Sequence, residues 1–326
     1  MVGTVPDAAP QERVVEIRGL TKFFGDVVAV RDLSFTVVPG RVTGFLGPNG
    51  AGKTTTLRIL LGLVRATRGT ATIGGRRYVD LASPQTTVGA LLEASSFHPG
   101  RTARDSLRVA AHPARVSDDR IDELLALVDL TPAAHRRVGE FSLGMRQRLG
   151  LAQALLGDPG VLILDEPANG LDPEGIAWLR GFLRSLAAEA RTILISSHVL
   201  SEVQQIVHDV VIIARGQLVR SGPLEELSGS GSVRALTPDA VRLVAALTTA
   251  GVEVRAPRPE EVLARGTTPA VVGHVAFTAG VELHGLGPAE GDLETIFLRL
   301  VAGAETAARP DGAGPVSPPA PPEVTP

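Results

Sequence analysis

The sequence predicts an α/β protein built around a parallel β-sheet and followed by a smaller α+β domain, and three observations carry this prediction. Short apolar runs of buried-strand type alternate with a helical stretch, as in βαβ units. The runs are residues 161–164, 192–196 and 210–213, and the helical stretch is 174–190. A glycine-rich loop separates another short apolar strand from a helix. A Ser/Gly run at 228–232 marks a linker between the two parts.

The N-terminal part begins with a predicted antiparallel β region. Within residues 13–40 apolar and polar side chains alternate, which is the pattern of half-buried strands. The apolar positions are Val15, Ile17, Leu33, Phe35 and Val37. Residues 42–46 form a short apolar strand, and a helix is expected after the glycine-rich loop because apolar side chains recur there with helical spacing. Its apolar stripe is Leu57, Leu60, Leu61 and Val64.

The middle of the chain, residues 101–157, is predicted to be a helical insertion. Ser117 is a suitable N-cap because its hydroxyl can accept a hydrogen bond from a free backbone N–H of the first helical turn. The apolar face of the helix that follows is Ile121, Leu124, Leu125 and Val128.

Beyond the linker, the pattern predicts a second α+β unit without a catalytic motif. It comprises an apolar run at 233–236, a helix after Pro238, apolar runs at 252–254 and 271–277, and a last short helix at 293–301. The expected organisation is a flexible N-terminus (1–12), the main α/β domain (13–227), a linker (228–232), a C-terminal accessory domain (233–303) and a disordered, Pro-rich tail (304–326).

Composition bounds the class of protein. The chain has 326 residues, no cysteine and a net charge of −3, which excludes disulfides and thiolate chemistry and argues against a protein that coats nucleic acid. No apolar run approaches the roughly 18 residues that a bilayer-spanning helix needs. Residues 1–10 lack the basic start and apolar stretch of a secretory signal. We therefore expect a cytoplasmic protein of about two domains.

The glycine-rich loop has the pattern Gly-x-x-x-x-Gly-Lys-Thr. Glycines let backbone N–H groups turn toward a triphosphate, and the lysine neutralises its β and γ oxygens. The expected ATP-binding residues are Gly47, Pro48, Asn49, Gly50, Ala51, Gly52, Lys53, Thr54 and Thr55. The hydroxyl of Thr54 is expected to hold Mg²⁺.

A second motif places two carboxylates, Asp165 and Glu166, directly after the apolar run 161–164. Ligands of parallel α/β sheets bind at the C-terminal ends of the strands. We expect Asp165 to orient Mg²⁺ and Glu166 to polarise the attacking water as a general base. Together the two motifs indicate a P-loop nucleotide hydrolase.

Residues 140–148, Glu-Phe-Ser-Leu-Gly-Met-Arg-Gln-Arg, resemble the signature sequence of ATP-binding-cassette (ABC) ATPases. The resemblance implies that Ser142 and Gly144, with Met145 in the same loop, contact ATP bound by a second copy of the chain. Anion binding at a helix N-terminus is the physical basis, and hydrolysis then requires a dimer. Leu143 and Met145 depart from the common form, which has Gly and Gln, but export-type members share the Ser-x-Gly-Met form.

Three further residues fall at functional positions of the same family. Residues 169–172, Asn-Gly-Leu-Asp, resemble the D-loop, whose Asp172 would cross the dimer interface. His198, after the run 192–196, looks like the switch histidine that contacts the γ-phosphate. Phe24 falls where the family stacks an aromatic ring on adenine, with core packing as the alternative.

Glu93 stands where most ABC ATPases have a glutamine that binds Mg²⁺ and faces the membrane partner. A carboxylate can ligate Mg²⁺ but adds negative charge beside the triphosphate. The same substitution occurs in ATPases that resemble the bacitracin-resistance and lantibiotic-immunity type. Residues 293–298 are similar to the end of drug-export ATPases of the daunorubicin-export type, so the resemblance covers about residues 13–301.

The resemblance implies the ATPase subunit of an ABC transporter that exports a drug-like, peptide or lipid-like substrate, with Lys53, Glu166 and His198 as catalytic residues and ATP and Mg²⁺ as cofactors. Its partners would be a second copy and a separate multi-span membrane permease near residues 93–104, at the cytoplasmic face of the membrane, without nucleic acid. An importer ATPase, a soluble ABC ATPase acting on ribosomes or DNA, and a non-hydrolysing scaffold remain alternatives. The soluble type usually carries tandem cassettes or a coiled-coil insertion, neither of which this sequence shows.

Overall fold

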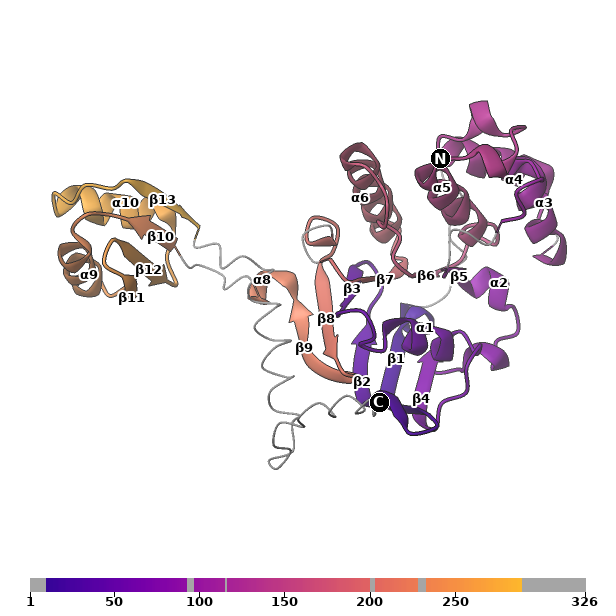
Figure 1. Cartoon of the computed structure of the whole chain (residues 1–326), viewed down its shortest axis with the longest axis horizontal. Coiled ribbons are helices and arrows are strands. Elements are labelled where there is room, and N and C mark those ends of the chain that lie inside the picture. The colour runs from indigo at the N-terminus through magenta and orange to yellow at the C-terminus, as the bar shows by residue number, and fades with distance from the viewer. Residues whose placement is uncertain (1–9, 93–96, 115, 200–202, 228–232, 289–326) are drawn as a thin grey trace, which may run out of the picture.

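The structure is a computed structural model that describes residues 10–92, 97–114, 116–199, 203–227 and 233–288 (Figure 1). Within these ranges the strands form three sheets. Several predictions lie outside the described residues: the flexible N-terminus before residue 10, Glu93, the linker 228–232, the last helix and the Pro-rich tail.

The largest sheet has six strands in the order β5-β6-β7-β3-β8-β9. They are β5 (Val88–Leu91), β6 (Val161–Leu164), β7 (Thr192–Ser197), β3 (Val42–Leu46), β8 (Asp209–Ala214) and β9 (Gln217–Pro223). The first five strands run parallel, which confirms the predicted parallel sheet, and β9 pairs antiparallel with β8. Strands β5 and β9 were not predicted from the sequence. Strand β5 is short and contains Gly89, where a Cβ would lie 2.0 Å from the carbonyl oxygen of Ala154.

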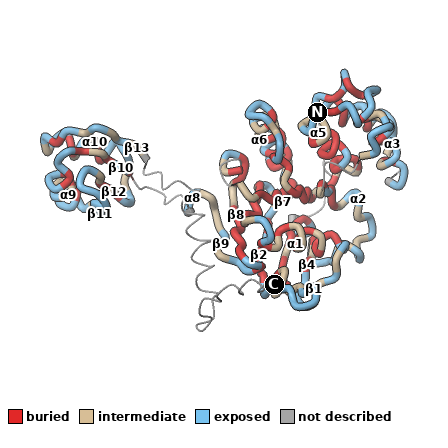
Figure 2. Tube along the Cα trace, in the orientation of Figure 1, coloured by how far each residue is buried: buried red, intermediate tan, exposed pale blue. Residues whose placement is uncertain are grey.

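Side chains of the six-stranded sheet alternate between two cores. Figure 2 shows the strands at the centre of this sheet coloured as buried. Val161 and Ile163 pack on the side of helix α1 (Lys53–Leu60), whereas Leu162 and Leu164 pack on the side of helix α6 (Pro173–Ala188). Both helices were predicted and are confirmed. Helix α1 ends before the last two residues of its predicted apolar stripe, which are still apolar contacts of the same core.

The predicted antiparallel region, residues 13–40, is confirmed as a pair of strands, and a strand that was not predicted completes a three-stranded sheet in the order β2-β1-β4. Its strands are β1 (Val15–Phe24), β2 (Val27–Val37) and β4 (Arg68–Ile73). Its apolar face shares one core with α1, so the glycine-rich loop lies between two sheets that fix its ends.

The predicted helical insertion contains α3 (Ala103–Ala111), α4 (Asp118–Leu127) and α5 (Leu143–Ala154). Ser117 caps α4 as predicted, with its Oγ accepting from the N–H of Arg120 at 3.4 Å. The predicted apolar face of α4 is buried. Short elements complete the main domain: α2 (Pro84–Thr87), α8 (Leu224–Leu227) and 3₁₀ turns at Pro10–Arg13, Tyr78–Asp80, His112–Ala114, Thr131–Ala133 and Val138–Glu140.

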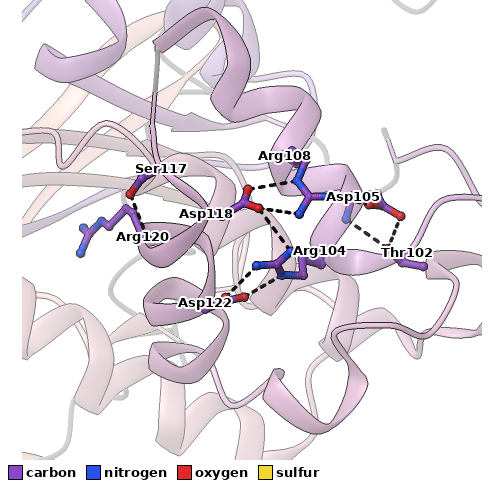
Figure 3. Close-up of polar contacts among 8 residues, drawn as sticks. All are labelled: Thr102, Arg104, Asp105, Arg108, Ser117, Asp118, Arg120 and Asp122. Carbon is purple, nitrogen blue, oxygen red and sulfur yellow. Dashed lines mark hydrogen bonds and ion pairs between the residues drawn. The ribbon is translucent and has the colours of Figure 1, made fainter.

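A network of ion pairs joins α3 to α4 (Figure 3). Arg104 binds both oxygens of Asp122 at 2.8 and 2.7 Å, and Asp118 lies 2.6 Å from Arg108 and 3.5 Å from Arg104. These groups are exposed, so each pair contributes little stability alone, but the shared geometry fixes how α3 lies against α4.

The C-terminal unit has its own core and a four-stranded antiparallel sheet in the order β11-β12-β10-β13. Along the chain it reads β10 (Val233–Leu236), α9 (Ala240–Thr249), β11 (Glu253–Arg258), β12 (Glu261–Arg265), α10 (Pro269–Thr278) and β13 (Gly285–Pro288). This βαββαβ order is the ferredoxin-like topology. The apolar run 271–277, whose type the sequence left open, lies in helix α10. None of the described helices has both the length and the apolar character needed to cross a membrane.

Arg191, at the start of β7, is completely buried and supports the sheet through polar contacts. Its guanidinium binds Asp158 at 2.8 Å, Glu189 at 2.9 Å and the carbonyl oxygen of Pro159 at 2.9 Å. We expect Arg191→Ala to destabilise the main domain by about 3 kcal/mol, because the variant removes a buried ion pair with Glu189 and leaves Asp158 only its contact with Arg120 at 3.4 Å. Thermal unfolding followed by circular dichroism measures this.

The control is Arg77→Ala, which removes an exposed pair with Asp80 and should leave the melting temperature unchanged. Equal shifts in the two variants would contradict a structural role for the buried guanidinium.

Candidate functional site

The glycine-rich loop connects β3 to α1, and its backbone requires glycine at three positions. Gly50 and Gly52 have φ angles of +79° and +102°, which L-residues with side chains rarely adopt. A Cβ at Gly47 would lie 2.5 Å from the carbonyl oxygen of Ile213, and one at Gly52 would lie 2.5 Å from that of Ala29. No side chain caps the N-terminus of α1, so its first N–H groups are available to an anion.

Lys53 lies inside the loop, with its side chain only 6% exposed. Its Nζ donates to the carbonyl oxygens of Gly47 at 2.6 Å and Pro48 at 3.3 Å, and it lies 3.6 Å from Oε1 of Glu166. Burial lowers the pKa of Lys53, and the nearby carboxylates oppose that shift. The other predicted ATP-binding residues differ in their surroundings. Asn49 is exposed, Ala51 is buried, and Thr55 lies in the first turn of α1.

The C-terminal end of β6 brings the two predicted carboxylates to the same loop. Asp165 is buried, and its Oδ2 accepts a hydrogen bond from Oγ1 of Thr54 at 2.9 Å. Glu166 has a left-handed backbone with φ of +50°, and its Oε2 lies 2.9 Å from Nδ1 of His198. The structure therefore gathers five predicted residues, among them Lys53, in one place.

Ser196, which was not predicted from the sequence, connects the two carboxylate residues. Its fully buried hydroxyl donates to Oδ1 of Asp165 and accepts the backbone N–H of Glu166 at 2.9 Å. Ser196 therefore orients the other carboxylate oxygen of Asp165, Oδ2, toward Thr54. It also holds the left-handed backbone of Glu166 in place. The available signal was a polar side chain inside a buried strand, two residues before His198.

The donor set at this point fits a hard divalent cation. The hydroxyl of Thr54 and the carboxylate of Asp165 are oxygen ligands at hydrogen-bond distance from each other, and Mg²⁺ prefers few protein oxygens together with water and substrate phosphates. Glu93, the third predicted metal ligand, lies outside the described residues.

The predicted signature and D-loop residues lie at two helix starts. Ser142 caps α5, with its Oγ accepting from the N–H of Met145 at 3.2 Å, and Gly144 lies in the first turn. Asp172 caps α6, with its Oδ1 accepting from the N–H of Gly175 at 2.7 Å. Each side chain thus stabilises its own helix start, which presents backbone N–H groups outward.

The site combines a buried lysine in a glycine-rich loop with carboxylates and a histidine at the ends of two strands. This is the site of a P-loop nucleotide hydrolase. A family model described as ABC transporter matches residues 30–169, and a model for a domain of unknown function matches residues 231–294. Over 217 residues, 66% of this chain and 71% of the relative, the chain is 44% identical to the bacitracin transport ATP-binding protein BcrA of Bacillus licheniformis. The chain belongs to the family of ABC transporter ATP-binding proteins.

Further comparisons agree. The lantibiotic transport ATP-binding protein SrtF of Streptococcus pyogenes is 37% identical over 68% of this chain and 95% of its own length. The solved dimeric ATP-binding cassette MJ0796, bound to ADP and phosphate, superimposes with a TM-score of 0.59 over 64% of this chain and 98% of that one, at 22% identity. The chain is thus an ATPase subunit of an ABC transporter, and the predicted fold class and family resemblance are confirmed.

Phe24, at the end of β1, is half exposed. The Nζ of Lys22 lies 4.7 Å from the centre of its ring. If adenine stacks on this ring, Phe24→Ala should weaken ATP binding by about tenfold, because base–aromatic stacking contributes about 1–3 kcal/mol. Titration with ATP and with inorganic tripolyphosphate separates the contribution of the base from that of the phosphates.

Tripolyphosphate binding should be unchanged, and Phe23→Ala, at the neighbouring exposed ring, should bind ATP normally. The exposure of Phe24 contradicts the core-packing alternative. Equal weakening for both ligands, or none for ATP, would contradict adenine stacking on its ring.

Proposed function

We propose that the chain powers export of a peptide-like, drug-like or lipid-like antibiotic through a separate multi-span membrane permease. The observation that carries the cargo and direction is the 44% identity to a bacitracin transport protein. The hydrolytic part of the proposal is supported by the convergence of Lys53, Thr54, Asp165, Glu166 and His198.

In the proposed mechanism, the phosphates of ATP take the place of the loop carbonyls as partners of Lys53. Thr54 and Asp165 would hold Mg²⁺, which neutralises charge on the phosphate oxygens when bound. Glu166 accepts the proton of the attacking water, and His198 orients the Glu166 carboxylate through its contact with Oε2. The rigid left-handed backbone at Glu166, fixed by Ser196, keeps the base in position.

Two copies of the chain would enclose the ATP molecules. We assign the helix starts at Ser142 and Asp172 to the surface that faces the second copy, with Gly144 and Met145 beside its nucleotide. Supporting this assignment, the MJ0796 cassette of the same fold is dimeric, and helix N-termini favour anions.

For the permease contact, we favour an apolar groove of about 630 Å³ whose lining includes Leu92 and Phe97, the described residues on either side of 93–96. Its apolar lining includes Leu63, Val64, Tyr78, Leu92 and Phe97. Of the sequence-predicted contact residues, Arg104 is already bound to Asp122 and Asp118, so its charge serves the α3–α4 contact. Membrane association would follow from this docking.

The test combines copurification and transport. Tagged chain from detergent-solubilised host membranes should retain a multi-span membrane protein, and inverted vesicles carrying that complex should accumulate labelled bacitracin or a lantibiotic when ATP is added. Glu166→Gln vesicles are the control and should not accumulate it. Recovery of soluble partners alone, such as ribosomal proteins, would refute the transport role. ATP-driven accumulation by right-side-out vesicles would indicate an importer.

A further inference from the structure

The start of α5 and the start of α6 meet in a contact that involves Leu143, the residue where the signature departs from its common glycine. Gly170 has a φ of +73°, and a Cβ there would lie 2.1 Å from Cδ2 of Leu143. Leu143 therefore occupies the space over Gly170. In the reciprocal direction, Cδ2 of Leu171 lies 3.3 Å from the position of a Cβ at Gly144. Each leucine packs over the glycine of the other segment.

The same two helices touch again along their length. The guanidinium of Arg148, in α5, lies 4.2 Å from the ring centre of Trp178, in α6. Trp178 stacks on Phe182 at 5.0 Å with an interplanar angle of 13°, and Arg148 also binds Asp129 at 3.0 Å. We call these contacts the α5/α6 seam: Leu143, Gly144 and Arg148 against Gly170, Leu171 and Trp178.

The seam joins the signature loop to the D-loop, and the proposed function assigns both segments to the contact with the second copy. Ser142 and Asp172 cap the helices on either side of it, and both are proposed to face the second copy. Leu143 remains 42% exposed although it packs over Gly170, so its contact adds little to the hydrophobic core. A residue in that position is suited to orienting a loop rather than to stabilising the domain.

The geometry points to Leu143 as a positioning residue: through the α5/α6 seam it locks the signature loop to the D-loop, so that both approach the second copy as one rigid unit. The inference rests on the proposed nucleotide-sandwich dimer. Without Leu143 only the contacts of Leu171 with Gly144 and of Arg148 with Trp178 hold the signature loop to the D-loop, so the loop is positioned less tightly. A displacement of about 1 Å at a reacting site can lower a rate by as much as 100-fold.

The test measures ATP turnover of the full chain as a function of ATP and of protein concentration. We expect Leu143→Ala to lower kcat by roughly tenfold and to require about tenfold more protein for half-maximal activity per chain. The KM for ATP at high protein concentration and the melting temperature should be unchanged. Leu143→Met should retain most activity. Leu218→Ala, at a leucine of similar exposure on β9, is the matched control and should behave as wild type.

Trp178 is the one tryptophan of the chain and gives a second readout. Its emission should change when ATP assembles the wild-type dimer, and this change should be reduced in Leu143→Ala. Wild-type kinetics and emission in Leu143→Ala, or a lowered melting temperature with proportionate loss of turnover, would overturn the positioning role. Wild-type turnover per chain that stays constant down to protein concentrations at which the ATP-bound chain is monomeric would instead refute the sandwich dimer of the proposed function.

Discussion

Glu166→Gln is expected to reduce ATP turnover by about 10²- to 10⁴-fold, the range that a general base contributes, while ATP binding persists. The amide keeps the size of the carboxylate and can still contact His198, but it cannot take a proton from water. In the wild type the negative charge of Glu166 lies 3.6 Å from Nζ of Lys53. Removing this charge should not weaken the attraction between the site and the triphosphate. Single-turnover hydrolysis and an equilibrium titration with labelled ATP measure the two effects separately.

The matched control for this variant is Glu123→Gln, at an exposed glutamate of α4 that pairs with Arg120. It should hydrolyse ATP at the wild-type rate. If Glu166→Gln retained more than a tenth of the wild-type turnover, the general base would have to be another group.

Lys53→Met is expected to weaken ATP binding by on the order of 100-fold, because a hydrogen bond to a charged group contributes about 1.5–3 kcal/mol. Methionine has a similar length and fills the buried space, but it supplies neither positive charge nor donors for Gly47 and Pro48. Calorimetric titration with ATP gives the affinity.

A circular dichroism melt checks that the Lys53→Met loop still folds. Arg220→Met, which removes an exposed cation on β9, is the control and should bind ATP as wild type does. Unchanged ATP affinity in a folded Lys53→Met protein would show that the loop does not hold the phosphates.

Much of the fold follows from local pattern. The β3 and β6 strands have the predicted bounds because a short, continuous apolar run between polar turns leaves few alternatives. Ser117 was identifiable as a cap because its effect is confined to one helical turn. Strand β9 was not predicted because most of it is exposed, and its pairing with β8 gives it no apolar periodicity.

The residues of the candidate site were predictable where chemistry constrains a short stretch of chain. Gly47, Gly52 and Lys53 stand close together in one loop, so their spacing alone indicates phosphate binding. Their approach to Asp165 was expected because ligands bind at the C-terminal ends of parallel strands, and their approach to His198 was inferred from family resemblance. Pairing of β3, β6 and β7 sets both distances, and no local pattern does.

By itself the sequence determined the class of protein, the phosphate loop and the acidic strand end, because each depends on neighbours in the chain. Tertiary structure alone decided the contacts between segments far apart in sequence. The hydroxyl of Ser196 connects Asp165 to the backbone of Glu166, and Leu143 packs over Gly170. Such contacts depend on the register of parallel strands and the packing of two helices, which no local pattern encodes.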